Sequence, residues 1–433
     1  MSDRASAPIS RRALLGAAAV GLAAPLAARP AVAADAAGRK KIAVLGTVIF
    51  EYSHTQHILD RLAGGYPWQG AWRAPRLDVA SVHIAQYPEG DGDKKKPDLG
   101  RQRIARYGLK SFPTVREALT LGGEKLAVDG VVIIAEHGDY PKNEKGQTRY
   151  PRYDWFKECV KVFEDSGRSV PVFNDKHLST EWDECAEMVA DSRRLGFPFL
   201  AGSSLPVTVR QPAIDMPLDV PLLESVCMCY GGVDSYDFHG LETAQCMSER
   251  RRGGEVGIRS VHALKGESLW TALAAADRDV TRRLVVAALN RSHNLPVEGG
   301  WVTAPVTFDW ARTALADSTG YLVDHRDGFR TTMIMGPLRD FTYAGLRSDT
   351  GEIVSCLMHL PMPQYGATTA DFFHPLTHHI EDLVLEGREP WPVERTLLTS
   401  GMVIGGVESL AAGGKPYATP QMAVAYRAPR QST

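Results

Sequence analysis

A carboxylate, an ammonium and an imidazole stand together at the end of one apolar stretch of the chain. They belong to Asp175, Lys176 and His177, which follow the run "VPVFN". Side chains of these types accept and donate protons, so the triplet could act on a polar substrate. A lysine at the end of a buried strand loses hydration, which is expected to lower its pKa toward a catalytic range. The alternative is an ordinary Lys–Asp ion pair in a turn.

A second pair of proton-transferring groups lies in the segment "GGVDSYDFHGLE". His239 and Glu242 are three residues apart, so they share a face of the helix predicted over 234–251. An imidazole and a carboxylate at this spacing suit general acid–base catalysis, with the carboxylate orienting the ring. Alternatively, His239 packs in the core and Glu242 pairs with the arginines of 250–252. The spacing alone favours neither interpretation.

A polar loop begins where the strand predicted over 129–137 ends. Its His137 and Asp139 could hydrogen-bond to a polyol. The loop also offers aromatic rings that could stack on a sugar, at Tyr140, Tyr150 and Tyr153. Long loops at the ends of strands are often functional, which favours binding over simple rigidification by proline and tyrosine.

Histidines also suggest metal binding. His54 and His57 share a helix face and could hold a metal or a phosphate, or one could pack at the helix start while the other is solvated. A second metal set would combine groups from two strand ends, namely His137, Asp139, Asp175 and His177. Neither set is complete on spacing alone.

Apolar runs that alternate with helical periods position these groups. Strands are predicted over 41–49, 77–85, 129–137, 170–175 and 198–203, and helices over 53–62, 98–107, 113–121, 151–166 and 179–195. Continuous apolar strands that alternate with helices indicate a parallel sheet covered on both faces. Ligands bind beyond the carboxyl ends of such strands, which is where the triplet and His137 fall.

The order of predicted strands and helices changes after about residue 212. Strand-like stretches separated by Gly, Asp and Asn turns are predicted over 260–266, 299–311, 319–337, 340–349 and 352–362, with helical pieces near 234–251 and 376–386. This pattern predicts an α+β domain over 213–430 with a mixed or antiparallel sheet. The predicted α/β domain covers 38–212.

The turn after the first strand bears on nucleotide binding. A dinucleotide fingerprint places G-x-G-x-x-G there, so that the backbone can approach a pyrophosphate at the helix N-terminus. Only Gly46 is present, and Val48 and Glu51 occupy the next two glycine positions. Because a glutamate would repel a diphosphate, the turn predicts an altered or lost nucleotide site.

The first 33 residues are predicted to be a twin-arginine-type signal peptide. "SRRALLGAAAVGLAAPLAARPAVA" has paired arginines, a short apolar stretch and a small-residue cleavage site. We therefore expect a periplasmic or secreted protein. No later window is apolar enough to span a bilayer.

Composition excludes some functions. The formal net charge is −2, so there is no basic excess to hold a nucleic acid. The six cysteines are scattered without a C-x-x-C pair, which predicts buried free thiols.

Two motifs resemble the glucose–fructose oxidoreductase/inositol dehydrogenase (Gfo/Idh/MocA) family. "DGVVIIAEH" is similar to that family's "DAVVIATP" strand, and the triplet at 175–177 stands where the family has Glu-Lys-Pro. "GGVDSYDFHGLE" resembles G-G-x-x-x-D-x-G-x-H-x-x-D, with a one-residue shift that leaves Asp234 or Ser235 near the upstream aspartate. The resemblance covers most of residues 41–255. It implies a Rossmann-like first domain.

The resemblance also implies roles for the site residues. Lys176 would lie beside the nicotinamide of NAD(P) and the substrate hydroxyl, and His239 would be the catalytic histidine. The full set of expected residues is catalytic Lys176, His239, Glu242 and Asp175, cofactor-binding Gly46, Thr47, His54 and His137, and substrate-binding Asp139, Tyr140, His177 and Asp237. A homo-oligomer, formed through exposed sheet faces in the second half, is expected by analogy.

Three functions follow. The first is an exported oxidoreductase acting on a small-molecule carbohydrate (a sugar or polyol), with tightly held NAD(P). The second is a hydrolase or lyase on glycosides or keto-sugars that binds no nucleotide and acts with or without a divalent metal. The third is a carbohydrate-binding protein without catalysis.

Overall fold

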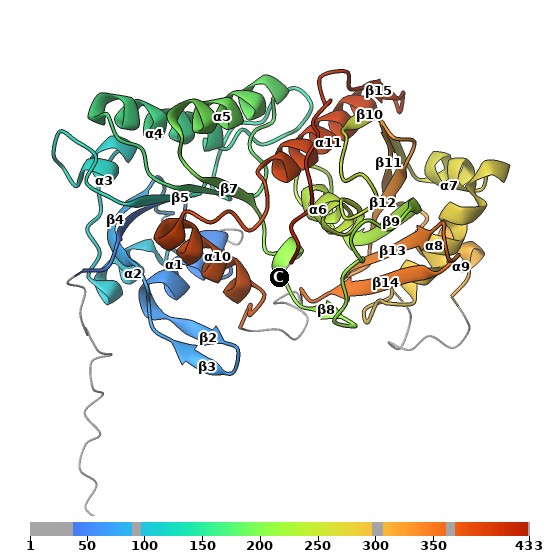
Figure 1. Cartoon of the computed structure of the whole chain (residues 1–433), viewed down its shortest axis with the longest axis horizontal. Helices are drawn as coiled ribbons and strands as arrows, with labels where there is room; N and C mark the ends of the chain where they lie inside the picture. Colours follow the sequence, from blue (N-terminus) through green and yellow to red (C-terminus); the bar gives the residue numbers. More distant parts are fainter. Residues whose placement is uncertain (1–37, 89–96, 297–305, 361–368, 432–433) are drawn as a thin grey trace, which may run out of the picture. The chain divides into compact units, whose positions relative to one another are not determined.

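The computed structural model describes residues 38–88, 97–296, 306–360 and 369–431. Residues 39–433 form one compact unit that contains two large sheets (Figure 1). The predicted signal peptide at 1–33 and most of the polar loop 88–98 lie outside the described residues.

The first sheet is parallel throughout, as predicted. Its strand order is β4-β1-β5-β6-β7. The strands are β1 (Lys41–Gly46), β4 (Asp78–Ile84), β5 (Gly130–Ile134), β6 (Val172–Asp175) and β7 (Phe199–Gly202). Each falls within a predicted run.

Helices cover both faces of this sheet. One face carries α1 (His54–Gly64), α2 (Gly100–Tyr107) and α10 (Phe373–Glu386), and the other carries α3 (Val115–Thr120), α4 (Arg152–Ser166) and α5 (Trp182–Leu195) (Figure 1). Along β1, Ile42 and Val44 join the first core, while Ala43 and Leu45 join the second. Burial on both sides explains why the strand reads as a continuous apolar run.

Two predicted helix starts differ in outcome. The helix predicted over 113–121 is α3, and Thr114 caps it by accepting a hydrogen bond from the Glu117 backbone N–H at 3.1 Å. The helix predicted over 179–195 starts later than expected, because α5 begins three residues after Ser179 with Glu181 as its N-cap residue. Ser179 instead donates its hydroxyl to the Glu184 side chain.

A short hairpin, β2 (Tyr66–Trp68) and β3 (Ala71–Arg73), was not predicted. It ties α10 to the first sheet, although α10 lies some three hundred residues further along the chain. The Trp68 ring stacks on His378 with centroids 4.4 Å apart, and the Tyr66 hydroxyl donates to Glu381 at 2.8 Å. The chain therefore returns late to complete the layer beside α1.

The second sheet is mixed and has eight strands, in the order β15-β10-β11-β12-β9-β13-β14-β8. They are β8 (Arg210–Gln211), β9 (Leu222–Tyr230), β10 (Ile258–Lys265), β11 (Thr319–His325), β12 (Arg330–Gly336), β13 (Phe341–Arg347), β14 (Ile353–Met358) and β15 (Tyr417–Ala418). β9 and β12 pair in parallel, and the other neighbours are antiparallel.

The prediction of a strand over 299–311 is wrong for those of its residues that the structure describes. Residues 299–305 lie outside the described residues, and the following segment forms α9 (Phe308–Ala314). Thr307 caps this helix by accepting from the Trp310 backbone N–H at 3.1 Å. The local cap outweighs the strand-like composition.

Both faces of the second sheet carry helices. One face packs on α6 (Asp237–Ser248) and α11 (Glu394–Ala411), and the other on α7 (Glu267–Leu273), α8 (Asp279–Leu289) and α9. The open sheet face expected to support an oligomer is therefore covered by this chain's own helices.

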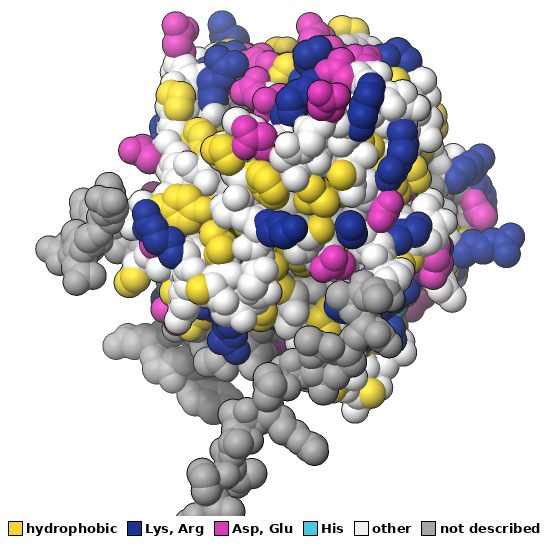
Figure 2. Space-filling view, turned by 90° about the vertical axis from the view of Figure 1, so that its left-hand side faces the viewer, with side chains coloured by type: hydrophobic (Ala, Val, Ile, Leu, Met, Phe, Trp, Pro, Cys, Tyr) yellow, Lys and Arg dark blue, Asp and Glu magenta, His cyan; other side chains and the backbone are white. Residues whose placement is uncertain are grey.

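Other general expectations can be checked on the described residues. All six cysteines are buried free thiols, as predicted. Among the described helices, none combines the length and hydropathy that a bilayer span requires. Figure 2 shows Lys and Arg interspersed with Asp and Glu at the top of the molecule, where α4 and α5 lie in Figure 1. Ion pairs between these two helices include Lys157–Glu187 and Arg194–Glu164.

Candidate active site

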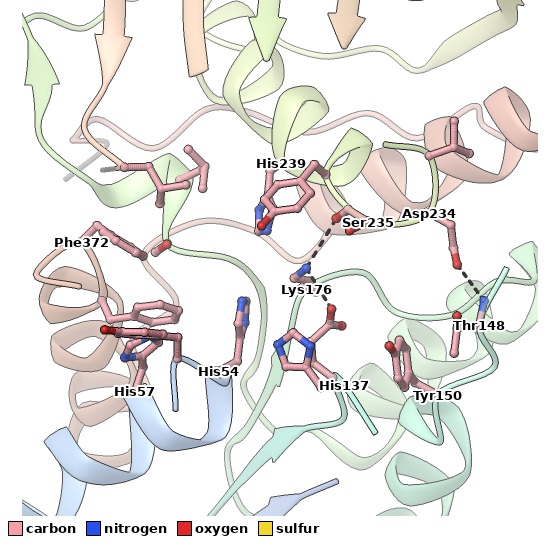
Figure 3. A pocket seen from close by; sticks show the side chains of 18 of the residues that line it. His54, His57, His137, Thr148, Tyr150, Lys176, Asp234, Ser235, His239 and Phe372 are labelled. Atoms are coloured by element: carbon pink, nitrogen blue, oxygen red, sulfur yellow. Dashed lines mark hydrogen bonds and ion pairs between the residues drawn. The ribbon is translucent and has the colours of Figure 1, made fainter. Parts of the chain in front are cut away.

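A polar pocket of about 370 Å³ lies beyond the carboxyl ends of β5 and β6. Its lining comes from several regions of the chain. It includes Tyr52, His54, His57, Glu136, His137, Tyr150, Lys176, Asp234, Tyr236, His239, Phe372 and Phe373. Figure 3 shows the side chains of His54, Lys176 and His239 directed toward the same space. Four predicted site residues are thus brought together: Lys176, His239, His54 and His137.

Lys176 is held by a carboxylate that the sequence interpretation overlooked. Its ammonium lies 3.0 Å from Glu136 Oε1 and donates to the Ser235 carbonyl at 3.5 Å. Glu136 also pairs with the buried Arg152. Burial by itself would lower the pKa of Lys176, but the charges of Glu136 and Asp175 outweigh it and raise the pKa. The expected lowering is wrong, and Lys176 is a charged hydrogen-bond donor.

His239 belongs to a three-member chain of hydrogen bonds. Its Nδ1 lies 2.9 Å from the hydroxyl of Ser203, which donates to Glu242 Oε2. Glu242 Oε1 accepts from the Ser203 backbone N–H at 3.0 Å. The carboxylate thus reaches the ring mainly through the serine, because the direct His239–Glu242 distance is 3.8 Å.

The surroundings favour the neutral forms of His239 and Glu242, the two ionisable groups at the ends of this hydrogen-bonded series. Burial, together with the charges of Lys176 and His54, holds the pKa of His239 well below its ordinary range. Burial also raises the pKa of Glu242 to about 7. Gly202 permits this close approach, since it has φ +124° and a Cβ there would lie 2.6 Å from Glu242 Oε1.

A second imidazole is supported by Asp175. His54 Nδ1 lies 2.7 Å from Asp175 Oδ2, and Asp175 is fully buried. The rings of His54 and His239 have centroids 6.4 Å apart. Two imidazoles therefore face one pocket. His54 is joined through Nδ1 directly to a buried carboxylate, and His239 is joined through Nδ1 and a serine to another.

Backbone strain gathers at the pocket. Tyr52, His137, Lys176 and Asp234 all line it, and each has a φ between +57° and +70°. Non-glycine residues rarely adopt this region, and functional sites are where such strain concentrates. Asp234 is anchored there by the Thr148 backbone N–H, which donates to it at 2.7 Å, and burial raises the pKa of Asp234 to about 6.

The four residues expected to bind substrate do not line the pocket. His177 is buried and its Nε2 lies 3.1 Å from the Arg152 guanidinium, and Asp237 accepts from the Tyr321 hydroxyl at 3.0 Å. Asp139 is exposed, and its backbone N–H and carbonyl both form hydrogen bonds with the Gln86 side chain. The Tyr140 ring packs edge-on against Tyr150. These residues shape the walls behind the site.

Gly46 and Thr47 lie beneath the site. The Thr47 hydroxyl donates to the Glu136 carbonyl at 2.6 Å, which fixes the strand end that carries this carboxylate. A Cβ at Gly46 would lie 2.5 Å from Thr55 Cγ2, so the glycine allows α1 to pack closely on β1.

The β1–α1 turn uses its own polar groups to satisfy its backbone. The Phe50 and Gln56 N–H groups each donate to the Ser53 hydroxyl at 3.2 Å. The Tyr52 N–H donates to the Gln56 side chain at 3.0 Å, and the Ser53 N–H donates to the Phe50 carbonyl at 3.0 Å. Val48 and Ile49 are buried beneath the turn.

Metal binding finds no support in the part of the chain that is described. There, no group of three or more His, Cys, Asp or Glu side chains is arranged to hold a metal ion. Of the predicted metal ligands His137, Asp139, Asp175 and His177, Asp175 contacts His54 and His177 contacts Arg152 instead.

Comparison with known proteins defines the class of fold. No known family model matches the sequence, and no curated protein matches it. The solved structure of GenD2 from gentamicin A biosynthesis, in complex with NAD, aligns with a TM-score of 0.54 and 14% identity, over 88% of this chain and 96% of GenD2. A protein assigned as a myo-inositol dehydrogenase from Sinorhizobium meliloti aligns with a TM-score of 0.52 and 10% identity, over 88% and 99% of the two chains.

A protein assigned as a dehydrogenase from Thermotoga maritima gives a TM-score of 0.51 at 10% identity, again over 88% and 99% of the two chains. The protein therefore has the fold of the Gfo/Idh/MocA-type dehydrogenases, a Rossmann-like parallel sheet followed by a mixed sheet. The predicted resemblance and fold class are confirmed.

Proposed function

We propose that the protein is an oxidoreductase-like enzyme that acts on a sugar or polyol, with Lys176 and His239 transferring the proton of a substrate hydroxyl. The observation that carries this proposal is the meeting of a charged lysine and a neutral histidine in one polar pocket. The fold it shares with GenD2 and the assigned inositol dehydrogenase supports a carbohydrate substrate.

The two groups take different parts. The Lys176 ammonium donates a hydrogen bond to the substrate oxygen and stabilises negative charge that develops on it. His239 accepts the hydroxyl proton at Nε2, because its Nδ1 faces Ser203. The rings of Tyr150 and Tyr236 line the same pocket and supply apolar surface for the carbon skeleton.

The fold family implies NAD(P), which would accept hydride from the substrate carbon, but the turn that should cradle its diphosphate does not fit. In that turn the N–H groups of Phe50, Tyr52 and Gln56 already have partners within the turn or in the first helical turn. Val48 replaces the glycine that lets a pyrophosphate approach the backbone, and Glu51 adds negative charge. The roles proposed for Lys176 and His239 therefore do not include hydride transfer to a nucleotide.

The occupied turn and the second imidazole favour a second function, a lyase that acts on a keto-sugar glycoside without a nucleotide. His239 Nε2 would remove the proton from the carbon beside the keto group, while Lys176 stabilises the enolate oxygen. A proton on His54 Nε2 would pass to the departing glycosidic oxygen as the C–O bond breaks. A carbon–carbon double bond forms, and no oxidant is needed.

Cofactor content separates the two functions. The protein is purified in its folded form and denatured, and the supernatant is analysed for nicotinamide nucleotides and for metals. Stoichiometric NAD(P) supports the oxidoreductase, and its absence, together with cleavage of methyl 3-keto-glucoside followed by proton NMR, supports the lyase. If the protein yields no nucleotide and converts neither this glycoside nor myo-inositol supplied with NAD⁺, both functions are rejected.

Substitution tests the proposed roles. Lys176→Ala and His239→Ala should each lower turnover of whichever probe is active by roughly 10² to 10⁴, the usual contribution of one acid–base group. Lys161→Ala, on the exposed face of α4, is the matched lysine control and should keep wild-type turnover. Full activity in either pocket variant removes its proposed role.

We also propose export through the twin-arginine route, supported by the paired arginines at Arg11 and Arg12 and the small-residue site before residue 34. Replacing both arginines with lysine should leave uncleaved protein in the cytoplasm. Export of the doubly substituted protein at the wild-type level would contradict this route.

A further inference from the structure

The serine between His239 and Glu242 lies where it can carry protons in either direction. Ser203 is buried, its hydroxyl contacts both partners, and its backbone N–H also binds the carboxylate. The Leu205 backbone N–H donates to the same hydroxyl oxygen at 3.3 Å, which helps to fix its position. A hydroxyl is both a donor and an acceptor, so the hydrogen-bond direction along the chain can reverse.

We propose that Ser203 relays a proton from His239 to Glu242, so that the histidine accepts a proton from substrate without holding a positive charge. The inference rests on the proposed proton transfer from a carbohydrate, and it adds Ser203 and the final proton acceptor. It applies whether that proton leaves an oxygen or a carbon.

The proton transfers balance over His239, Ser203 and Glu242. Before transfer, His239 Nδ1–H donates to Ser203 Oγ, and the Ser203 hydroxyl donates to ionised Glu242. His239 Nε2 then takes the substrate proton while Nδ1 gives its own proton to Ser203 Oγ, and the serine passes its original proton to Glu242 Oε2. The ring ends as the opposite neutral tautomer, Glu242 ends as a carboxylic acid, and the substrate retains the electron pair.

The charges around the chain favour this end state over an imidazolium paired with a carboxylate. Burial and the nearby cations keep the His239 ring neutral, and the raised pKa of Glu242, at about 7, suits it to hold the proton near neutrality. The titratable and charged groups that face the relay come from several elements, namely Asp175, Lys176 and His177 at the end of β6, Glu136 after β5, His54 on α1 and Arg395 on α11.

The relay makes the tautomer of His239 depend on the protonation of Glu242, even without substrate. Above the pKa of Glu242, the carboxylate draws the Ser203 hydroxyl proton and His239 carries its proton at Nδ1. Below it, the carboxylic acid donates to Ser203, the hydroxyl donates to Nδ1, and the ring carries its proton at Nε2. A ring that is only held in place by Ser203 would not change tautomer.

Nuclear magnetic resonance of ring-labelled histidine tests this directly in the ligand-free mature protein. The His239 signals are assigned by their loss in His239→Asn, and ring carbon and nitrogen shifts are followed from about pH 5.5 to about pH 9. We expect the Nδ1–H tautomer at high pH and the Nε2–H tautomer at low pH, with a midpoint near the pKa of Glu242.

Three variants separate a relay from a structural contact. Glu242→Gln should lock the Nε2–H tautomer at every pH, because the amide donates to Ser203 as the carboxylic acid does. Ser203→Ala should remove the pH-dependent change, and Ser203→Thr, which keeps the hydroxyl, should restore it. Ser248→Ala removes another buried serine hydroxyl from α6, bonded to Ser225 and Tyr343, and should titrate as wild type.

The relay is overturned if the wild-type ring keeps one tautomer throughout, becomes an imidazolium at that midpoint, or titrates unchanged in Ser203→Ala. Because no substrate is added, these outcomes are independent of the enzyme assays. A relay seen in a protein without carbohydrate activity would overturn the proposed function alone.

Discussion

The β1–α1 turn and the ends of β5, β6 and β7 lie along one edge of the parallel sheet, yet they use their polar groups differently. In the turn, the side chains of Ser53 and Gln56 accept hydrogen bonds from the N–H groups of Phe50, Tyr52 and Gln56. At the other strand ends, Glu136 after β5 holds Lys176 after β6, and Ser203 after β7 joins His239 to Glu242 on α6. Lys176 and His239 both line the pocket. On the proposed function, the groups for proton transfer face the substrate pocket, while polar groups of the β1–α1 turn bond to one another where a diphosphate would lie.

On the proposed function, the two regions correspond to two halves of a dehydrogenase site, the proton-transferring groups and the nucleotide-binding turn. Acid–base groups need support from the core, and this chain provides it from β5, β7 and α6. A nucleotide cradle needs bare backbone and small residues, which are lost by substitutions in a single turn. The turn can therefore change without disturbing the proton-transferring groups.

The largest expected effect comes from breaking the carboxylate support of Lys176. Glu136→Gln leaves the buried Lys176 and Arg152 without their shared carboxylate, so it should lower the free energy of unfolding by about 3–5 kcal/mol, as expected when one partner of a buried ion pair is removed. Urea denaturation at neutral pH measures this difference. Glu187→Gln, which breaks an exposed pair on α5, is the control and should have a small effect.

The same variant has a predictable pH dependence. Burial opposes ionisation of Glu136, but Lys176 and Arg152 outweigh it and hold the pKa of Glu136 well below its ordinary range. A lowered pKa in the folded state gives stability that is present above the ordinary pKa and is lost as pH falls through the folded value. The gap between wild type and Glu136→Gln should therefore shrink in acid, and a constant gap would contradict the ion-pair assignment.

A smaller effect, of the opposite sign, is expected at Glu242. Its pKa rises from an ordinary 4.5 to about 7, so ionisation of Glu242 costs stability that is fully present below pH 4.5 and is lost as pH rises through 7. This rise corresponds to at most about 3 kcal/mol. Glu242→Gln should therefore be more stable than wild type at alkaline pH and similar in acid, as measured by thermal unfolding across pH. A variant less stable than wild type at alkaline pH would show that the carboxylate is ionised there without cost.

The sequence predicted the parallel sheet and the position of Lys176 because both follow from local pattern. Apolar runs that are buried on two faces mark the strands, and a strand end places the next residue at the ligand-binding edge. Glu136 was missed for a physical reason: it follows β5 without any local sign that its partners, Lys176 and Arg152, come from the end of β6 and the start of α4.

Other features depended on contacts that spacing does not encode. His239 and Glu242 lie on one helix, as predicted, but their spacing gave no sign of Ser203, which joins them and is distant in sequence. A strand was predicted over 299–311 from its strand-like composition, whereas the cap at Thr307 starts a helix at Phe308. The return of α10 to the first sheet also depends on tertiary packing, through Trp68 and Tyr66.

The smallest expected effect tests the other side of the comparison, the self-satisfied turn. Ser53→Ala removes the acceptor of the Phe50 and Gln56 N–H groups and should lower the free energy of unfolding by about 1 kcal/mol, the usual cost of losing a helix N-cap. Ser53→Asp keeps an acceptor at this position and should recover the loss, while Thr114→Ala removes the cap of α3 and gives the matched cost at a site away from the pocket. Urea denaturation of the three variants measures the difference. If Ser53→Ala is as stable as wild type while Thr114→Ala is less stable, the turn is held by something other than the Ser53 cap. The hydrogen bonds within the turn would then not be what stabilises it.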